Sequence, residues 1–577
     1  MEKIMENYIR YEDFGAIGDG VNNDFFAMQA AHKYANENGL AVKGDPNATY
    51  LIGNKEKDGK ASSIHIKTDT DWCGATIILD DTDTCWVPNN PEANYNVHPF
   101  FIKSDYTPVV LPDEVCKKIN ANGGIKDNNL KKVETGLGYP ALLIFSNSNE
   151  RVYIRYGVNR NPGIEKREFV VVDAEGNIEE DTPFLFDYDE VERITAYRID
   201  DKPITVENAT FISKASRANL VTEYHNICSG IMVERSNTTV RNLYHKITGE
   251  IDKYAVVDKD SNVLAGYTYN KESEKVFDPE GREVTDGHAK PYIGHSYSAF
   301  LRPSNANNVL IEGVTFQARV YYLQGTYDLG CGMSNRVVFK NCDQSNFFSN
   351  DRPGMPRYPG MGKWWGVGGS SFCKNMTYDG CRLTRYDAHS SLVNGKILNS
   401  EIAATRLTGA GDMLIENTKL YGYSSTFISL REDYGATWRG TITIKDCEVY
   451  DVKGTSSLTN LFTFLSANHW FGYPVYFPNI IIDNLKIENP RSTVHIVNDP
   501  QYDPTVPNYY FRSVYEPGIS TAGAICRDQK ENANVVTPPE FIKVINNEEN
   551  GYKLTLYESE FFKNTKTEGV SLIPREE

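Results

Sequence analysis

Residues 13–24 read Asp-Phe-Gly-Ala-Ile-Gly-Asp-Gly-Val-Asn-Asn-Asp and lead directly into a helical stretch. Three glycines stand within six positions: Gly15, Gly18 and Gly20. Glycine tolerates positive φ angles and tight turns, so this spacing predicts a sharply turned segment. No other stretch says as much about the architecture of the whole chain.

A helix is predicted over residues 25–38, because apolar side chains recur there on one side. Asn23 or Asp24 can cap its start, and Gly39 is well placed to end it. Two short strands are predicted next, over residues 41–42 and 49–52.

Farther along the chain, short apolar strands recur, each interrupted by Asn, Asp or Gly. Steps of about twenty residues between such positions are typical of single coils of a solenoid, and longer steps carry loop insertions. The Asn-rich column predicts side-chain amides stacked at a turn, whereas a β-sandwich would give hairpin signals without a column. The column consists of Gly313, Asn341, Gly380, Asn399, Asn417, Asp446 and Asn484.

The 13–24 stretch and the helix after it resemble the amino-terminal cap of right-handed parallel β-helix proteins. These are the pectate lyases and the polygalacturonases of glycoside hydrolase family 28, in which an Asp-Phe-Gly-Ala-x-Gly-Asp-Gly turn precedes a plugging helix. The resemblance implies an all-β, right-handed parallel β-helix with an N-terminal capping helix. It also implies a carbohydrate substrate, but no particular reaction, because hydrolases, lyases and phage tailspikes share the motif.

Four regions are expected along the chain. Asp/Gly turns such as Asp173-Ala174-Glu175-Gly176 interrupt the coil pattern and indicate inserted antiparallel β-hairpins. The predicted regions are a cap with the first coils (1–95), an inserted β-rich segment (96–200), the parallel β-helix (201–500) with a hairpin insertion at 248–292, and a C-terminal capping tail (501–577).

Composition narrows the partners and the compartment. A net charge of −17 repels nucleic acid and anionic membranes, so neither is an expected partner. The ten cysteines form no CxxC pair or zinc spacing and are typical of buried thiols in a reducing compartment. The start of the chain does not read as a signal peptide. We therefore expect a cytoplasmic protein, or a secreted or cell-surface one if a leader has been removed.

The richest polar and aromatic stretch spans residues 349–439 and opens with a long Gly/Pro-rich loop. Long loops on a rigid scaffold commonly carry binding residues. We expect Lys363, Trp364 and Trp365 to form a wall of a sugar cleft, with a Trp ring as a stacking surface. The alternative is that the Trp side chains only pin the loop to the coil.

Three aspartates follow at intervals of 25 and 21 residues, each close to one coil: Asp387, Asp412 and Asp433. Neighbouring coils lie about 4.8 Å apart, so these carboxylates are expected to stack as a ladder. Stacked carboxylates repel, which favours one protonated acid beside one ionised base. The alternative is a charge ladder that merely neutralises itself. The predicted catalytic residues are Asp387, Asp412, Asp433 and His389, and the predicted substrate-binding residues are Arg406, Arg431, Tyr386, Trp364, Trp365, Trp438, Lys363 and His469.

The signature motifs of polygalacturonases and pectate lyases are absent, so no catalytic residue is carried over from those families. The preferred function is acid/base hydrolysis of glycosidic bonds in a poly- or oligosaccharide by paired aspartates, without a cofactor or metal. One alternative is a polysaccharide lyase acting on a uronate, in which case Ca²⁺ is a possible cofactor. Another is a non-catalytic, glycan-binding or tailspike-like protein. Both a monomer and a homotrimer are compatible with the sequence.

Overall fold

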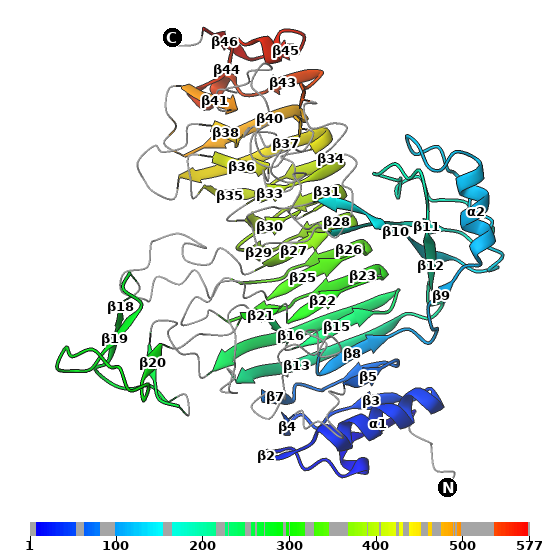
Figure 1. Cartoon of the computed structure of the whole chain (residues 1–577), viewed down its shortest axis with the longest axis vertical. Coiled ribbons are helices and arrows are strands. Elements are labelled where there is room, and N and C mark those ends of the chain that lie inside the picture. Colours follow the sequence, from blue (N-terminus) through cyan, green and yellow to red (C-terminus); the bar gives the residue numbers. More distant parts are fainter. Residues whose placement is uncertain are drawn as a thin grey trace.

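The chain winds into a parallel β-helix (Figure 1). The computed structural model describes residues 7–53, 63–80, 98–153, 164–214, 226–228, 230–248, 255–259, 262–270, 272–291, 296–298, 300–317, 328–344, 367–388, 390–402, 405–422, 426–430, 438–451, 460–463, 475–488, 490, 493–497 and 536–574. In these parts the predicted right-handed β-helix with a capping helix and inserted antiparallel hairpins is confirmed.

One side of the coil, here called the first face, is a stack of parallel strands in two sheets. The bridge between Ser371 and Ser390 joins the two sheets. The strands of the first face are β5 (Ile64–Ile66), β8 (Phe100–Lys103), β15 (Ile231–Glu234), β22 (Leu301–Pro303), β25 (Leu329–Gly332), β27 (Val367–Ser371), β30 (Tyr386–Asp387), β33 (Thr405–Leu407), β36 (Thr426–Leu430), β38 (Asn460–Thr463), β41 (Thr493–Val497), β44 (Lys553–Tyr557) and β46 (Ser571–Ile573).

The other two sides form one large sheet, which bends at a corner within each coil. We call the strands before this corner the second face and those after it the third face. The strands of the large sheet are β1 (Tyr8–Arg10), β2 (Asp19–Asn23), β3 (Ala41–Lys43), β4 (Thr49–Gly53), β6 (Thr70–Asp71), β7 (Thr76–Asp80), β13 (Ile204–Lys214), β16 (Thr238–Thr248), β23 (Asn307–Glu312), β24 (Thr315–Phe316), β26 (Asn335–Lys340), β28 (Lys374–Asp379), β29 (Arg382–Leu383), β31 (Leu392–Leu398), β32 (Glu401–Ile402), β34 (Gly409–Glu416), β35 (Lys419–Gly422), β37 (Trp438–Asp451), β40 (Asn479–Ile487), β43 (Phe541–Ile545) and β45 (Lys566–Glu568).

The predicted column of Asn, Asp and Gly residues marks this corner. All seven predicted positions adopt positive φ angles, between 47° and 64°. Asn tolerates this left-handed conformation better than most side chains do. The amides also stack as predicted, since Asn417 Nδ2 donates to Asn399 Oδ1 at 2.8 Å and Asn242 Nδ2 donates to Asn208 Oδ1 at 3.1 Å. The column therefore combines a backbone requirement with a side-chain ladder.

The capping helix α1 spans Phe25–Asn38, as predicted, and Gly39 ends it at a φ of 65°. The carboxylate of Asp24 accepts hydrogen bonds from the backbone N–H groups of Ile17, at 2.7 Å, and Leu51, at 3.2 Å. Asn23 Oδ1 accepts one from the Phe25 N–H at 3.0 Å. The acidic end of the motif thus ties the turn, the helix start and the first coil together.

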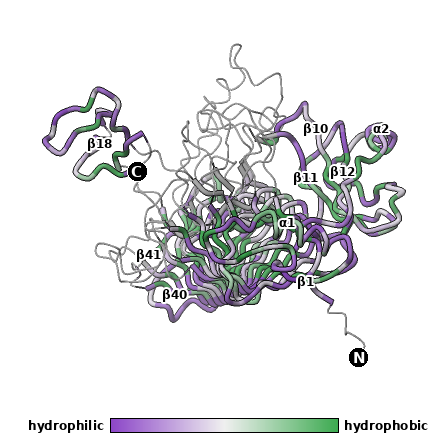
Figure 2. Tube along the Cα trace, turned by 90° about the horizontal axis from the view of Figure 1, so that it is seen from below, coloured by the Kyte–Doolittle hydropathy of each residue, from purple (hydrophilic) through white to green (hydrophobic). Residues whose placement is uncertain are grey.

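An inserted module, here called the insert, comprises the described residues 105–153 and 164–200 and stands beside the coil (Figure 1). It has a hydrophobic cluster of its own, which Met333 and Phe372 of the coil join. Viewed along the coil axis, the insert and the hairpin of β18 (Thr268–Asn270) and β19 (Lys275–Phe277) project from opposite sides (Figure 2). The insert holds α2 (Asp113–Ala121) and an antiparallel sheet of β9 (Val109–Val110), β10 (Ala141–Tyr153), β11 (Ile164–Val172) and β12 (Arg193–Arg198).

Shorter pairs of strands complete the set of described strands. Two of these pairs are antiparallel and lie in the predicted hairpin insertion at 248–292. The pairs are β17 (Val256–Val257) with β20 (Lys290–Pro291), β18 (Thr268–Asn270) with β19 (Lys275–Phe277), β14 (Asn226–Cys228) with β21 (Ser296–Ser298), and β39 (Val475–Tyr476) with β42 (Val536–Thr537).

The C-terminal region differs from its prediction. We expected residues 501–577 to leave the coil pattern and form a tail, but β43 pairs in parallel with β40 and then with β45. Asn546 adopts a φ of 53° and donates to Asp483 at 2.8 Å, which repeats the corner chemistry. The described C-terminal residues 536–574 therefore include further coil strands, because residues 541–546 still alternate apolar side chains before a corner residue.

Candidate functional site

Strand β30 of the first face carries an ion pair on the outer side of the coil. The ring of Tyr386 lies inside the coil, with its centroid 4.7 Å from that of Tyr378. Successive side chains of a strand point to opposite faces, so Arg385 and Asp387 both point outward. Arg385 Nη2 lies 2.5 Å from Asp387 Oδ2, and the two side chains are only 1 % and 0 % exposed. The outer side of the chain at β30 therefore holds a fully buried carboxylate and guanidinium.

Burying this pair is costly, because removing two charges from water costs several kcal/mol per ion before their attraction is counted. A coil strand does not require an ion pair there, since the first face could close with apolar or exposed side chains. Other described ion pairs, such as that of Lys374 with Glu168, are similarly buried, but the pair of Arg385 and Asp387 lies on the outer side of the first face. Arg385 and Asp387 are therefore the centre of the candidate site.

Charges on the other faces behave differently and match the self-neutralising alternative. On the second face, charges of opposite sign alternate from coil to coil, as in the register partners Glu312, Lys340 and Asp379. Lys340 Nζ lies 3.3 Å from Glu312 Oε1, and both side chains are partly exposed. The third face repeats the pattern, with Lys419 in register between Glu401 and Glu448. The charges on these two faces are partly exposed, whereas the pair of Arg385 and Asp387 is buried.

The predicted stacking of Asp387 on Asp412 is wrong. The register partner of Asp387 on the next coil is Arg406, and that of Arg406 is Ser429. Asp412 is exposed and lies in β34 of the large sheet, where its backbone N–H donates to Asn394 Oδ1 at 2.9 Å. The prediction failed because 25 residues are more than one coil, so Asp412 lies beyond the position that stacks on Asp387 and falls on the second face.

Two further predicted binding residues are buried among apolar side chains. Trp438 and Tyr386 are both 0 % exposed and belong to the hydrophobic core of the coil. The Trp438 Nε1–H donates to the Gly411 carbonyl at 3.0 Å. Neither ring offers a surface on which a sugar could stack, because the alternation of their strands turns both inward. Burial also raises the pKa of Tyr386 well above its ordinary value, so its hydroxyl stays protonated.

Arg406 is half-buried on the outer side of β33, directly beside Asp387 in the register. The structure therefore brings together Asp387 and Arg406 of the predicted set. The remaining predicted site residues lie outside the described residues, and their roles stay predictions. They are His389, Asp433, Arg431, Trp364, Trp365, Lys363 and His469.

Sequence reasoning missed a buried polar network just before Arg385. Gln344 Nε2 donates to Asp328 Oδ2 at 2.8 Å, and Gln344 Oε1 accepts from the Thr384 N–H at 2.9 Å. These three side chains are at most 2 % exposed. The network holds the backbone that presents the ion pair. The available signal was the step of 40 residues from Gln344 to Thr384, which parallels the step from Asn341 to Gly380 in the corner column.

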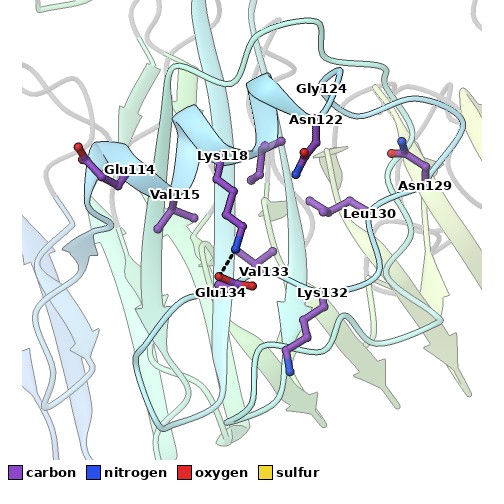
Figure 3. A pocket seen from close by; sticks show the side chains of 11 residues that line it. Glu114, Val115, Lys118, Asn122, Gly124, Asn129, Leu130, Lys132, Val133 and Glu134 are labelled. Atoms are coloured by element: carbon purple, nitrogen blue, oxygen red, sulfur yellow. Dashed lines mark hydrogen bonds and ion pairs between the residues drawn. The ribbon is translucent and has the colours of Figure 1, made fainter.

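The insert carries a pocket of about 370 Å³ between α2 and residues 129–134 (Figure 3). Val115 and Val133 contribute apolar surface to it, and Lys118 forms an ion pair with Glu134 across it. In Figure 1, α2 lies on the side of the insert that faces away from the coil. This pocket is therefore separate from the ion pair on β30.

In the same described parts of the chain, no group of three His, Cys, Asp or Glu side chains is arranged to hold a metal ion. No helix among those residues has the length and apolarity needed to cross a membrane.

No protein-family model and no curated protein sequence matches the chain. Among solved structures, the chain is similar to the tailspike of Pseudomonas phage phi297, with 11% identity, a TM-score of 0.41, and 86% of this chain and 81% of that one covered. It is similar to the Gp54 tailspike of Acinetobacter baumannii bacteriophage AP22, solved with a capsular saccharide, with 12% identity, a TM-score of 0.41, and 97% of this chain and 79% of that one covered. It is also similar to the Yersinia enterocolitica family 28 exopolygalacturonase, with 12% identity, a TM-score of 0.31, and 98% of this chain and 75% of that one covered.

Proposed function

We propose that this chain binds a poly- or oligosaccharide on the outer side of the first face and hydrolyses a glycosidic bond there. The observation that carries the proposal is the buried, outward-facing pair of Arg385 and Asp387. Glycoside hydrolysis requires carboxyl groups fixed beside the scissile bond, and a buried carboxylate held by a guanidinium has a fixed position. The resemblance of the 13–24 motif supports a carbohydrate as the substrate class.

In this proposal Asp387 acts as one catalytic carboxylate, and Arg385 positions it. Arg406, the register partner of Asp387, binds substrate. The second carboxylate is assigned to Asp433, which follows β36 by three positions in the sequence. Strand β36 carries Ser429, the next member of the same column.

The test is a panel of plant and microbial glycans, read for new reducing ends and for ultraviolet absorbance in parallel. Asp387→Asn is expected to lower turnover by at least about 100-fold, because it removes a carboxylate used in the bond-breaking step. Asp412→Asn is the matched control, since that side chain is exposed on another sheet and should leave turnover unchanged.

Three results would contradict the proposal. Wild-type turnover retained by Asp387→Asn, with an unchanged thermal midpoint, would remove Asp387 from the chemistry. An ultraviolet-absorbing unsaturated product would show β-elimination, and thus a lyase. Glycan binding by the wild type without any product would show a non-catalytic binding protein. Binding measured by gel retardation separates a lost reaction from a lost fold.

A further inference from the structure

Two thiols meet inside the coil, on neighbouring coils of the first face. Cys331 belongs to β25, and Cys373 follows β27, which pairs with β25 in parallel. The Cys373 sulfhydryl points at the Cys331 Sγ, and the two sulfur atoms are 3.2 Å apart. Both side chains are buried, at 3 % and 0 % exposure. A disulfide has a sulfur–sulfur distance of about 2.05 Å, so closure requires a shift of about 1 Å.

The other buried thiols of the coil also lie near backbone carbonyls. Cys342 donates to the Ile311 carbonyl at 3.6 Å, Cys381 to the Phe339 carbonyl at 3.2 Å, and Cys447 to the Lys445 carbonyl at 3.2 Å. Each of these three follows a corner residue of the column of Asn, Asp and Gly residues in the sequence. Cys373 likewise lies 3.7 Å from the Ser371 carbonyl, but its sulfhydryl also points at a second sulfur at 3.2 Å. That sulfur–sulfur contact distinguishes Cys331 and Cys373 from Cys447.

We propose that Cys331 and Cys373 form a latent disulfide that links two neighbouring coils when the chain meets an oxidising environment. The reaction is thiol–disulfide exchange with a low-molecular-weight disulfide. One cysteine sulfur attacks oxidised glutathione and releases one glutathione thiol. The second cysteine sulfur attacks the resulting mixed disulfide and releases the other. Two protein thiols lose two electrons, which reduce one oxidised glutathione to two thiols.

The pair lies beside the coil that carries the candidate site. The N–H of Phe372, the residue before Cys373, donates to the Ser390 carbonyl at 2.8 Å and so joins this segment to the coil that carries β30. The bond would close a loop from residue 331 to residue 373 and restrict the unfolded chain. By loop-entropy arithmetic scaled to a chain of this length, the thermal midpoint should rise by about 3 °C.

Burial raises the pKa of the Cys331 thiol, so the thiolate that starts the exchange is scarce in the folded protein. The experiment therefore has two arms. In one, purified reduced protein is incubated with oxidised glutathione at mildly alkaline pH. In the other, the chain is synthesised in an oxidising compartment, where the bond can form as the coils assemble. Free thiols are then alkylated under denaturing conditions, and peptides are analysed by mass spectrometry without reduction.

The expected result, in at least one arm, is a peptide joining Cys331 to Cys373, two fewer alkylated thiols per chain, and reversal by dithiothreitol. Cys373→Ser should abolish the rise in thermal midpoint, whereas Cys447→Ser, a buried thiol that donates to the Lys445 carbonyl, should keep it. Alkylation of both cysteines in both arms would overturn the inference, and so would a disulfide between either cysteine and a different partner. The wild-type peptide map decides the question even where a variant folds poorly.

Discussion

Replacing Lys374 by methionine should release the insert from the coil. Lys374 starts β28, and its ammonium is buried against the insert, with the side chain 3 % exposed. Its Nζ lies 3.5 Å from Glu168 Oε2 of β11 and donates to the carbonyls of Pro183, at 2.5 Å, and Thr182, at 3.4 Å. Glu168 is equally buried. One side chain of the coil thus binds two separate segments of the insert.

The magnitude follows from what the substitution leaves behind. A methionine side chain keeps the apolar volume of the lysine stem but leaves the Glu168 carboxylate without its cation, and removing one partner of a buried pair costs about 3–5 kcal/mol. Two contributions reduce this figure. Glu168 keeps hydrogen bonds from the N–H groups of Leu185, at 2.8 Å, and Phe186, at 3.0 Å. Burial also raises the pKa of Glu168, which makes its protonation less costly. We expect a loss of about 3 kcal/mol at neutral pH.

The assay is denaturant unfolding combined with hydrogen exchange of residues 164–186, in a double-mutant cycle with Glu168→Gln. The two substitutions should be coupled by at least about 1.5 kcal/mol, because the second removes the charge that the first strands. Lys340→Met is the matched control. It removes a partly exposed ion pair with Glu312 and should cost at most about 1 kcal/mol.

Two outcomes would refute the reasoning about this contact. One is a Lys374→Met protein whose unfolding free energy lies within about 0.5 kcal/mol of the wild type, since a buried pair cannot be broken so cheaply. The other is additive behaviour of the two substitutions, which would show that Lys374 and Glu168 do not stabilise each other.

Two further predictions concern stability. Burial lowers the pKa of His98 to about 3, so the stability it contributes is complete above its unfolded pKa near 6.5 and is lost as the pH falls toward 3. Among the described residues neither ring nitrogen of His98 has a hydrogen-bond partner, so His98→Phe should leave the free energy of unfolding nearly unchanged at pH 7. Between pH 6.5 and 4.5 the wild type should lose about 2.5 kcal/mol more of this free energy than the variant, as measured in urea titrations. Equal acid sensitivity of the two proteins would contradict this. Gly380→Ala places a Cβ 2.4 Å from the Asn341 side-chain oxygen at a φ of 64°, whereas Gly39→Ala meets nothing within 4 Å at a similar φ of 65°. Both should cost about 1 kcal/mol for the left-handed backbone, and Gly380→Ala about 1–2 kcal/mol more; equal thermal midpoints would show that the corner tolerates a methyl group.

Local chemistry explains why much of the fold could be predicted from the sequence. The glycines of the 13–24 motif and the column of Asn, Asp and Gly residues are required by backbone angles that few other residues adopt. The start of α1 follows from Asn23, whose Oδ1 accepts a hydrogen bond from the Phe25 N–H, and its end follows from Gly39 at a positive φ. Such requirements act within a few residues, so they can be read before any contact between coils is known.

Within the candidate site, Asp387 was predicted from its spacing to Asp412 and Asp433, whereas its buried partner Arg385 was not predicted. The sequence also determined which residues recur from coil to coil. It did not determine which face each one occupies. Asp412 has a spacing from Asp387 that suggests the same column, yet it lies on another sheet, because loops of variable length leave the coil and break the residue count.

Burial and long-range docking were decided by the tertiary structure alone. The outward-facing ion pair of Arg385 and Asp387 is buried although its strand position would allow exposure. Lys374 contacts Glu168, which lies 206 residues away in the sequence. A strand pattern specifies which side chains share a face. Whether a face meets water depends on segments that are distant in the chain, and only their packing decides which charges are buried together.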